Sequence, residues 1–362
     1  MNESYKASFL PLQKGIIDQM MFFEELIDAT SKLEVYKEKI HDSKLDSSWF
    51  MPTLQQKEAI ASSAIEGTQA TLDGVLINQL SQNDKDQDVN KVKNYYSATV
   101  KGYELLKYHD FSHEFFYTMH TTLMHGNVEK PEVIGAYRSS QNYIGKRNKM
   151  RSVTFIPPAP EEVKRLMDNL ISYINTPNDV FRPLVRIAII HAQFESIHPF
   201  MDGNGRVGRM LIPMYLFAKK QIDLPCFFIS EALERDKIKY YSLLNNIRFK
   251  EEWNEWIKFF LRTVAMQCEK YIQLITRINA LYDDHMNKAC SLAKSSSMVD
   301  VINALYSNPI TNTKMIAKIT ETPMTSINRY LGLLVENGIL FSDNKPRNRT
   351  YYYYALLDLL RE

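Results

Sequence analysis

The sequence predicts an all-α core with a small β-hairpin flap, followed by a smaller C-terminal domain that mixes helices and strands. Apolar residues recur at helical spacing along most of the chain, and the serine-rich stretch Lys294–Ser297 predicts a linker before the tail. With 362 residues, 45% of them hydrophobic, the chain is long enough for two or three domains and a sizeable core.

Amphipathic patterns predict the helices of the core in order. They run through about Leu54 to Ile65, Val92 to Lys107, Ser112 to His125, Pro160 to Thr176 and Trp253 to Leu281. The segment Leu184–Ile197 is apolar on nearly every side, so we expect it to be the central buried helix. The segment Lys149–Ile156 is rich in β-branched and aromatic residues, which predicts the hairpin or flap.

The tail follows a different pattern. Helices are expected over Val299–Tyr306 and Thr313–Ile319, and a third is expected to be capped by Thr322 and to end at Asn337-Gly338. Two strand-like segments, Ile339–Phe341 and Tyr351–Tyr354, then flank a basic, turn-rich stretch. This order of three helices and a hairpin is typical of a winged helix.

Composition narrows the function classes. A net charge of +2 gives no general electrostatic footprint for nucleic acid, so any such binding requires a local patch. The three cysteines are far apart and lack metal-ligand spacing, which indicates a reducing compartment. No apolar run approaches the length of a membrane span and no signal peptide is evident, so we expect a cytoplasmic protein without a membrane partner.

The twelve residues from His198 to Arg209, H-P-F-M-D-G-N-G-R-V-G-R, carry the strongest chemical signal. Glycines allow the backbone to approach a ligand, and N–H groups at the start of the following apolar helix converge on an anion. Arg206 and Arg209 are spaced to fork onto phosphate oxygens. Asp202 suits Mg²⁺, and His198 can accept a proton near pH 7. The segment therefore predicts a polyphosphate site.

These residues match the signature of the Fic family, H-P-F-x-D-G-N-G-R-x-G-R, and the chain resembles that family over roughly residues 50 to 260. The resemblance implies transfer of AMP from ATP to a Ser, Thr or Tyr hydroxyl of a protein, either a target or the chain itself. It implies that His198 is the general base, that Asp202 binds Mg²⁺ and that Arg209 contacts the γ-phosphate. The other phosphates would be held by Gly203, Asn204, Gly205 and Arg206, with Val207 and Gly208 in the same nucleotide-binding stretch.

A second signature lies upstream, at the end of a helix expected over residues 53–67. Residues 62–67, S-S-A-I-E-G, match the [S/T]-x-x-x-E-[G/N] motif of autoinhibited Fic proteins. By this resemblance Ser62 and Glu66 are inhibitory, and Glu66 lies beside the nucleotide. A carboxylate paired with Arg209 would keep that arginine from the γ-phosphate. Alternatively, Glu66 orients a water, and the site removes AMP instead of adding it.

The same resemblance suggests where the target and the adenine bind. A flap would pair with the target backbone through Val153, Thr154 and Phe155. Tyr241 is the main candidate for the adenine pocket, with Tyr240 and Asn245 as neighbours, and core packing is the alternative for either tyrosine.

His191, Glu195 and His198 share one helical face, a spacing that a metal triad could use. We expect instead that His191 and Glu195 form a satisfied buried pair, because His198 has another task.

In the winged helix, two groups of residues could bind DNA. Groove-facing candidates are Thr325, Ser326, Asn328 and Arg329, and phosphate contacts would come from Lys345, Arg347 and Arg349. A protein-interaction or dimerisation module is the alternative.

The expected domains are a helical region over 1–95, a catalytic core over 96–260, a connecting helix and linker over 261–293 and a winged helix over 294–362. Two hypotheses follow. The first is an autoinhibited adenylyltransferase that uses ATP and Mg²⁺. The second is a DNA-binding regulator whose core only senses nucleotide. The oligomeric state stays open, a homodimer included.

Overall fold

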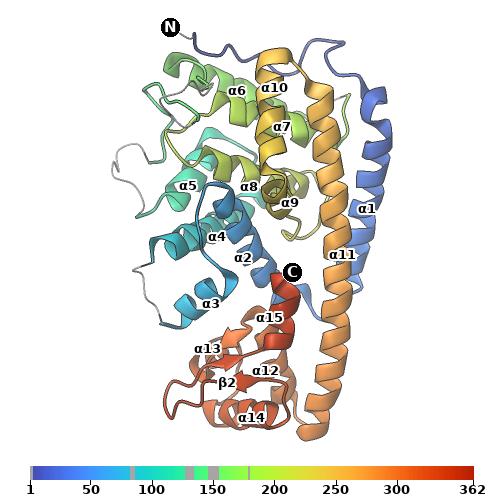
Figure 1. Ribbon diagram of the computed structural model, residues 1–362, viewed down its shortest axis with the longest axis vertical. Coiled ribbons are helices and arrows are strands. Elements are labelled where there is room, and N and C mark those ends of the chain that lie inside the picture. Colours follow the sequence, from blue (N-terminus) through green and yellow to red (C-terminus); the bar gives the residue numbers. More distant parts are fainter. Residues whose placement is uncertain (1–2, 82–85, 127–133, 146–154, 178–179) are drawn as a thin grey trace. The chain divides into compact units, whose positions relative to one another are not determined.

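A computed structural model of the chain describes residues 3–81, 86–126, 134–145, 155–177 and 180–362 (Figure 1). The described residues are mostly helical, with one small antiparallel sheet. They form two compact units. Unit 1 consists of Met1–Leu33, Ala61–Thr68 and Lys93–Cys268, and unit 2 consists of Glu34–Ile60, Gln69–Val92 and Glu269–Glu362.

Unit 1 holds the helices that surround the motif. Its own helices are η1 (Gln19–Phe22), α5 (His113–Leu123), α6 (Pro160–Asn175), α7 (Pro183–Ile197), α8 (Asn204–Ala218), α9 (Ser230–Arg235) and α10 (Lys237–Lys250). Four longer helices contribute residues to both units: α1 (Phe23–His41), α2 (Ser47–Ile65), α4 (Gln87–Leu106) and α11 (Trp253–Leu292).

Helix α7 forms the centre of unit 1. Every residue from Leu184 to Ile197 is buried, as expected for a helix that is apolar on nearly every side. It packs between α6 and α8, and α10 also contacts it (Figure 1). Pro183 occupies its first turn, where a missing backbone N–H costs nothing. The neighbouring α6 is amphipathic and spans the predicted segment.

The predicted bounds of α2 and α11 differ from the observed ones. Helix α2 begins at Ser47, well before the predicted start, although Pro52 lies inside it. Helix α11 continues to Leu292. The expected flap lies mostly outside the described residues. Ile144 and Phe155, which lie on either side of the undescribed stretch, form an isolated antiparallel bridge.

Unit 2 has its own small core. Its elements are α3 (Leu72–Ser81), α12 (Ser296–Ser307), β1 (Ile310–Thr311), α13 (Thr313–Ile319), α14 (Met324–Glu336), β2 (Phe341–Ser342), β3 (Tyr351–Tyr352) and α15 (Tyr354–Arg361). The strands form an antiparallel sheet in the order β1-β3-β2. Ile310 and Phe341 both lie opposite Tyr352.

Two sequence expectations for this unit need correction. Pro323, not Thr322, occupies the N-cap position of α14, and no side chain caps that helix. The second strand segment is shorter than predicted, because the chain turns after Tyr352 into α15 and buries Leu356, Leu357 and Leu360. Helix α13 has the predicted bounds, and α14 ends at Asn337 before Gly338, whose φ of 70° suits glycine.

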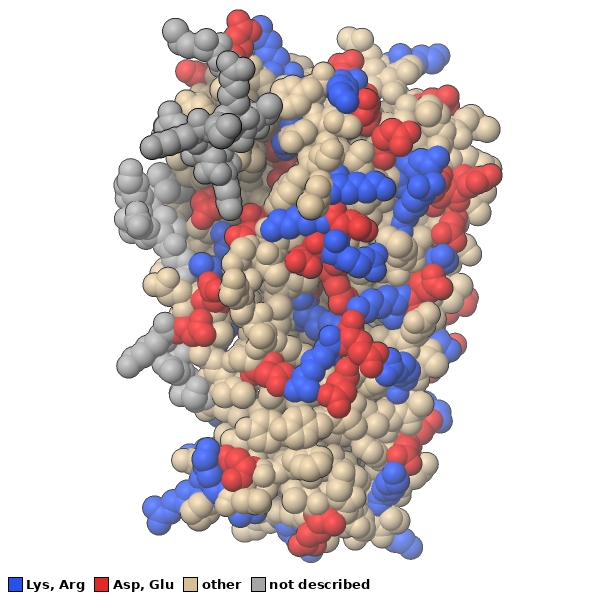
Figure 2. Space-filling model, viewed as in Figure 1, with Lys and Arg blue, Asp and Glu red and all other residues tan. Residues whose placement is uncertain are grey.

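In the view of Figure 2, lysine and arginine side chains are intermixed with aspartate and glutamate over the described surface. None of the helices in the described ranges combines the length and apolar content that a membrane span requires.

Candidate functional site

The motif forms a tight turn that joins the end of α7 to the start of α8. His198 caps α7 in the left-handed conformation, with φ 51° and ψ 61°, and its N–H donates to the Phe194 carbonyl at 2.9 Å. The buried Asn204 side chain closes the turn, because its amide donates to the Phe200 carbonyl at 2.7 Å and its oxygen accepts from the Phe200 N–H at 2.8 Å. Asn204 therefore shapes the loop with its side chain.

The start of α8 has the features of an anion site. The first bond from the Gly203 carbonyl is made by the Val207 N–H, so the N–H groups of residues 204–206 precede the helical ladder. Gly203, at the N-cap with φ 76°, supplies no capping side chain. The Val207 side chain is buried, which leaves only its backbone for a ligand.

Two guanidiniums extend this site. Arg206 Nε and Arg209 Nη1 are buried and have no hydrogen-bond partner within the described part of the chain. Arg206 has only weak neighbours, the Met124 sulfur at 3.5 Å and an Asp202 oxygen at 3.6 Å. Buried N–H groups seldom remain unsatisfied, so this pair fits the phosphate oxygens of a bound nucleotide.

Glu66 and Ser62 already occupy one side of Arg209. The Arg209 Nη2 lies 2.7 Å from Glu66 Oε1 and 2.9 Å from the Ser62 carbonyl, and its Nε donates to Ser62 Oγ at 2.8 Å. Burial alone would lower the pKa of Arg209, but Glu66, Tyr240, Tyr241 and Glu195 together outweigh it, with Glu66 contributing most, and the pKa is raised. The predicted contact between the upstream signature and the motif is thus present.

Gly205 makes room for that carboxylate. A Cβ built on Gly205 would lie 2.4 Å from Glu66 Oε1 and 2.9 Å from Arg209 Nη1. A side chain at this position would therefore meet the ion pair itself, which explains why the motif needs glycine here.

Asp202 is exposed at the rim of the turn. Its side chain is 75% exposed, and its Oδ1 accepts from the Gly203 N–H at 2.6 Å. The backbone of Asp202 is held by buried His120, which stacks on Phe200 with ring centroids 4.0 Å apart. Since the Gly135 N–H donates to His120 Nδ1, the proton is on Nε2, which donates to the Asp202 carbonyl at 3.2 Å. One exposed carboxylate beside a phosphate site fits Mg²⁺.

His198 is partly exposed as a residue, but its Nδ1 is buried without a hydrogen-bond partner among the described residues, and the guanidiniums of Arg248 and Arg138 lie nearby. Burial is the main cause that holds its pKa well below its usual range, and the guanidiniums of Arg248 and Arg138 add to it. The Glu195 carbonyl acts in the opposite direction. His198 is therefore neutral near pH 7 and can accept a proton.

His191 and Glu195 are not partners of each other. His191 donates from Nδ1 to the Gly208 carbonyl and accepts at Nε2 from the Tyr240 hydroxyl, both at 2.9 Å. Glu195 Oε1 is buried without a hydrogen-bond partner among the described residues. Burial raises the pKa of Glu195 to about 7. The described residues contain no cluster of three or more metal-ligating side chains, so a metal triad finds no support.

The candidates for the adenine pocket differ in exposure. Tyr240 is fully buried and bonds to His191, which is core packing. Tyr241 is 37% exposed, and its pKa is raised by burial and by the nearby Glu66 charge. Asn245 accepts from Arg248 Nη1 at 3.1 Å. Tyr241 is therefore the exposed one of the two tyrosines, and Asn245 is half-buried.

Of the three flap residues, Val153 and Thr154 lie outside the described residues. Phe155 is buried, and Arg248 lies over its ring at 4.0 Å. Its side chain therefore packs inside unit 1.

Two residues of the site carry no sequence signal: His120 and Arg138, which donates from Nε to the His198 carbonyl at 2.9 Å. Both act on backbone groups, which leave no pattern in a sequence.

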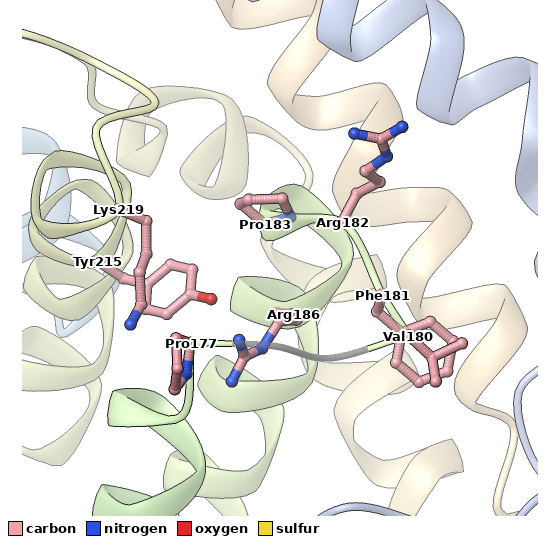
Figure 3. Close-up of a pocket in the computed structure, with 8 residues that line it drawn as sticks. All are labelled: Pro177, Val180, Phe181, Arg182, Pro183, Arg186, Tyr215 and Lys219. Carbon is pink, nitrogen blue, oxygen red and sulfur yellow. The ribbon is translucent and has the colours of Figure 1, made fainter.

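A cavity of about 390 Å³ lies at the other end of α7, lined by Pro183, Arg186, Tyr215 and Lys219 among others (Figure 3). Arg186 uses its guanidinium to bond the carbonyls of Tyr173 and Thr176 at the end of α6. The arginine therefore caps a helix, and the cavity is separate from the motif.

Comparisons with known proteins agree with the motif. The sequence model of the Fic/DOC family matches residues 110–216, and that of the Fic/DOC family N-terminal region matches residues 23–104. A protein adenylyltransferase fic-1 of Caenorhabditis briggsae is 28% identical over 170 residues, which are 46% of this chain and 29% of the relative. A probable protein adenylyltransferase of Aquifex aeolicus is 25% identical over 250 residues, 63% of this chain and 74% of the relative.

The chain spans less than a third of the length of the first of these relatives. Among solved structures, a Fic family protein of Desulfovibrio desulfuricans G20 superposes with a TM-score of 0.59 at 20% identity, covering 94% of this chain and 98% of that one. That likeness concerns the fold. The two matched regions together span just over half of the sequence, and the chain belongs to the Fic/DOC family.

Proposed function

We propose that the chain is an autoinhibited protein adenylyltransferase that transfers AMP from ATP to a Ser, Thr or Tyr hydroxyl of a protein. One observation carries the proposal: two buried guanidiniums with unused N–H groups, Arg206 and Arg209, lie at a helix start directly after His198. The names of the relatives support the same activity.

In the proposed reaction the target hydroxyl attacks the α-phosphorus of ATP. The new O–P bond forms as the bond from the α-phosphorus to the bridging oxygen breaks, and pyrophosphate leaves. His198 takes the hydroxyl proton, a role that its low pKa permits at neutral pH. The N–H groups at the start of α8 and the two arginines bind and orient the phosphates.

Asp202 would hold Mg²⁺, which neutralises phosphate charge when bound. His120 supports this role because it fixes the Asp202 backbone. Tyr241 is the proposed neighbour of the adenine.

Glu66 is the proposed inhibitor. Its carboxylate takes the Arg209 Nη2 group that the γ-phosphate would need. Ser62 accepts from Nε and Nη2, and Nη1 is left without a partner among the described residues. Every group proposed to bind the nucleotide is then available except Arg209, which is already paired with Glu66.

The test is incorporation of label from α-labelled ATP into the chain itself and into a cell extract as a source of targets. Glu66→Gly should raise incorporation at least 10-fold, and His198→Ala in the same background should abolish it. Glu162→Gly, an exposed glutamate of unit 1, is the matched control and should change nothing. Unchanged incorporation in Glu66→Gly would refute the inhibitory role.

The reverse reaction is distinguished with the same proteins. An AMP-modified protein is incubated with the wild type and with Glu66→Gly. Release of AMP by the wild type and its loss in Glu66→Gly would show that Glu66 serves removal of AMP.

A second function is favoured by unit 2. We propose that residues 296–361 form a winged helix that binds DNA. The element order and the β1-β3-β2 sheet support this fold. A groove of about 400 Å³ joins α13, α14 and the β2–β3 loop, and its polar lining includes Asn312, Lys314, Asn328 and Arg349. Thr325, Arg329, Lys345 and Arg347 are also exposed.

Arg347 and Arg349 are the proposed phosphate contacts, since neither has a carboxylate within 4 Å in the described ranges, whereas Lys345 pairs with Asp343 at 2.9 Å. Replacing both arginines with glutamine should weaken binding of duplex DNA and reduce the slope against log salt by about 2. Lys101→Gln/Lys107→Gln, a pair of exposed lysines of unit 1, should bind as the wild type does. No retardation of DNA by the wild type at low salt would refute the proposal and leave a protein-interaction or dimerisation module.

A further inference from the structure

Arg138 is a buried arginine whose guanidinium contacts only backbone carbonyls in the described structure. It is 3% exposed. Its Nε donates to the His198 carbonyl at 2.9 Å, and its Nη2 donates to the carbonyls of Pro158 at 2.5 Å and Ile197 at 3.4 Å. The Arg138 N–H also donates to the Pro199 carbonyl at 2.8 Å. Three consecutive carbonyls, of residues 197 to 199, are thus held by one residue.

These hydrogen bonds surround the one residue of the motif turn that has a strained backbone conformation. His198 is a non-glycine residue with φ 51°, a region that costs energy for an L-residue and persists only where the surroundings hold it. The bonds from Arg138 lie on both sides of that residue and at its own carbonyl. Arg138 therefore fixes the direction in which the turn presents the imidazole.

The positive charge of Arg138 is also favourable at its position, which is the C-terminal end of α7. The carbonyls at the end of α7 are the negative pole of that helix, and a cation there is favourable. No carboxylate lies within 4 Å of its guanidinium among the described residues, and Glu161 acts on it only from a distance. Burial lowers the pKa of Arg138 to about 10, so the guanidinium remains charged at neutral pH.

We propose that Arg138 is a positioning residue for His198, which holds the left-handed turn so that the imidazole faces the reacting hydroxyl. The proposal rests on the role of His198 as general base in the proposed function. Arg138 itself contacts neither nucleotide nor target in this assignment, because it acts through the backbone of residues 197–199.

The chain offers a matched control in Arg186. It is also 3% exposed, lies in unit 1 and bonds carbonyls at the end of a helix, here α6. It lies in the first turn of α7, at the opposite end from His198. A loss that comes only from removing a buried carbonyl-capping arginine should appear equally in variants of both residues.

The experiment compares Arg138→Lys and Arg186→Lys in the Glu66→Gly background. Lysine keeps the charge and the stem but cannot reach three carbonyls with a planar fork. Arg138→Lys should lower kcat at least 10-fold and leave the KM for ATP within about twofold, since the phosphate-binding residues are untouched. Arg186→Lys should leave kcat within about twofold at a comparable change in Tm. Equal losses of kcat in both variants, or no loss in Arg138→Lys, would overturn the proposal.

A second readout does not depend on activity. The His198 ring is followed by NMR during a pH titration, with His198→Gln to identify its signal. Burial is the main cause of the low pKa of this ring, Arg248 on α10 and Arg138 lower it further, and the Glu195 carbonyl on α7 raises it. In Arg138→Gln the ring should titrate at higher pH and its signal should broaden or shift as the turn loosens. An unchanged ring signal and titration would refute the positioning role, even if the chain transferred no AMP at all. Absence of AMP transfer in the Glu66→Gly parent would instead refute the proposed function.

Discussion

The buried carboxyl of Glu195 lies three residues before His198 and is only 6% exposed. Its Oε1 has no hydrogen-bond partner in the described residues, so the charged form is costly. Burial therefore raises the pKa of Glu195 to about 7, although Arg209 and Arg248 act against this. The folded protein holds this proton up to higher pH than the unfolded chain does, so Glu195 makes folding stability depend on pH.

Glu195→Gln should stabilise the protein more at pH 8 than at pH 5. Below the ordinary pKa of glutamate both states keep the proton and the site costs little. Between that pKa and about 7 the unfolded chain gives up the proton that the folded state keeps, so stability falls over this range. Above about 7 the folded state carries the buried charge, and the loss is complete. The amide avoids this cost, which amounts to up to about 3 kcal/mol at high pH.

The measurement is Tm at pH 5, 6, 7 and 8 for both proteins. Glu162→Gln, which removes an exposed carboxylate paired with Arg165, is the control and should give a flat difference. A Glu195→Gln difference that does not grow with pH would contradict the assignment.

At the scale of elements, the contact of α7 with α8 depends on a glycine. Gly208 has no side chain, and a Cβ added there would lie 2.2 Å from Glu195 Oε1 and 3.1 Å from Phe194 Cδ1. Its carbonyl meanwhile accepts from His191. The two helices therefore approach closely at the turn that separates His198 from the phosphate site.

Gly208→Ala should lower the free energy of unfolding by about 1 to 3 kcal/mol, because the added methyl must displace a buried side chain or separate the helices. Gly332→Ala, inside α14 with nothing within 4 Å of its Cβ, should stabilise unit 2 by up to about 1 kcal/mol. Denaturant unfolding of both variants gives the comparison. Equal effects of the two substitutions would show that the α7–α8 contact tolerates a side chain at position 208.

At the scale of the whole molecule, the proposed function links nucleotide binding and inhibition through one arginine, Arg209. A ligand that binds only the folded state raises Tm according to its affinity. Because Glu66 holds Arg209 at 2.7 Å, the proposed function requires Mg²⁺-ATP to bind the wild type against that contact.

Mg²⁺-ATP should therefore raise the Tm of Glu66→Gly more than that of the wild type. A tenfold difference in affinity corresponds to about 1.4 kcal/mol when the ligand concentration is well above both Kd values, or roughly 2–4 °C. Thermal shift assays with 1 mM ATP and Mg²⁺ measure it, and AMP, which lacks a γ-phosphate, should give a smaller difference. Equal shifts in both proteins would mean that Glu66 does not compete with the nucleotide.

The sequence could predict much of this molecule because the decisive signals are local. The buried pattern of α7, the motif at His198–Arg209 and the tail order are all read from short segments. The pairing of Ser62 and Glu66 with Arg209 followed from a family resemblance. The partners of His191 and the role of Arg138 could not be predicted, since they depend on carbonyls brought close by packing. The prediction that Thr322 caps α14 was wrong, because Pro323 occupies the N-cap position of that helix.

In the proposed function Glu66 competes with the nucleotide for Arg209, and this competitor belongs to the same chain. A tethered carboxylate has a fixed effective concentration at its site, whatever the amount of protein in solution. Dilution cannot release it. The apparent Kd of a nucleotide that needs Arg209 is the intrinsic value divided by the fraction of molecules in which Glu66 has moved away. A partner that displaces Glu66 from Arg209 would therefore lower the apparent Kd of the nucleotide in proportion to the fraction displaced, without contacting His198.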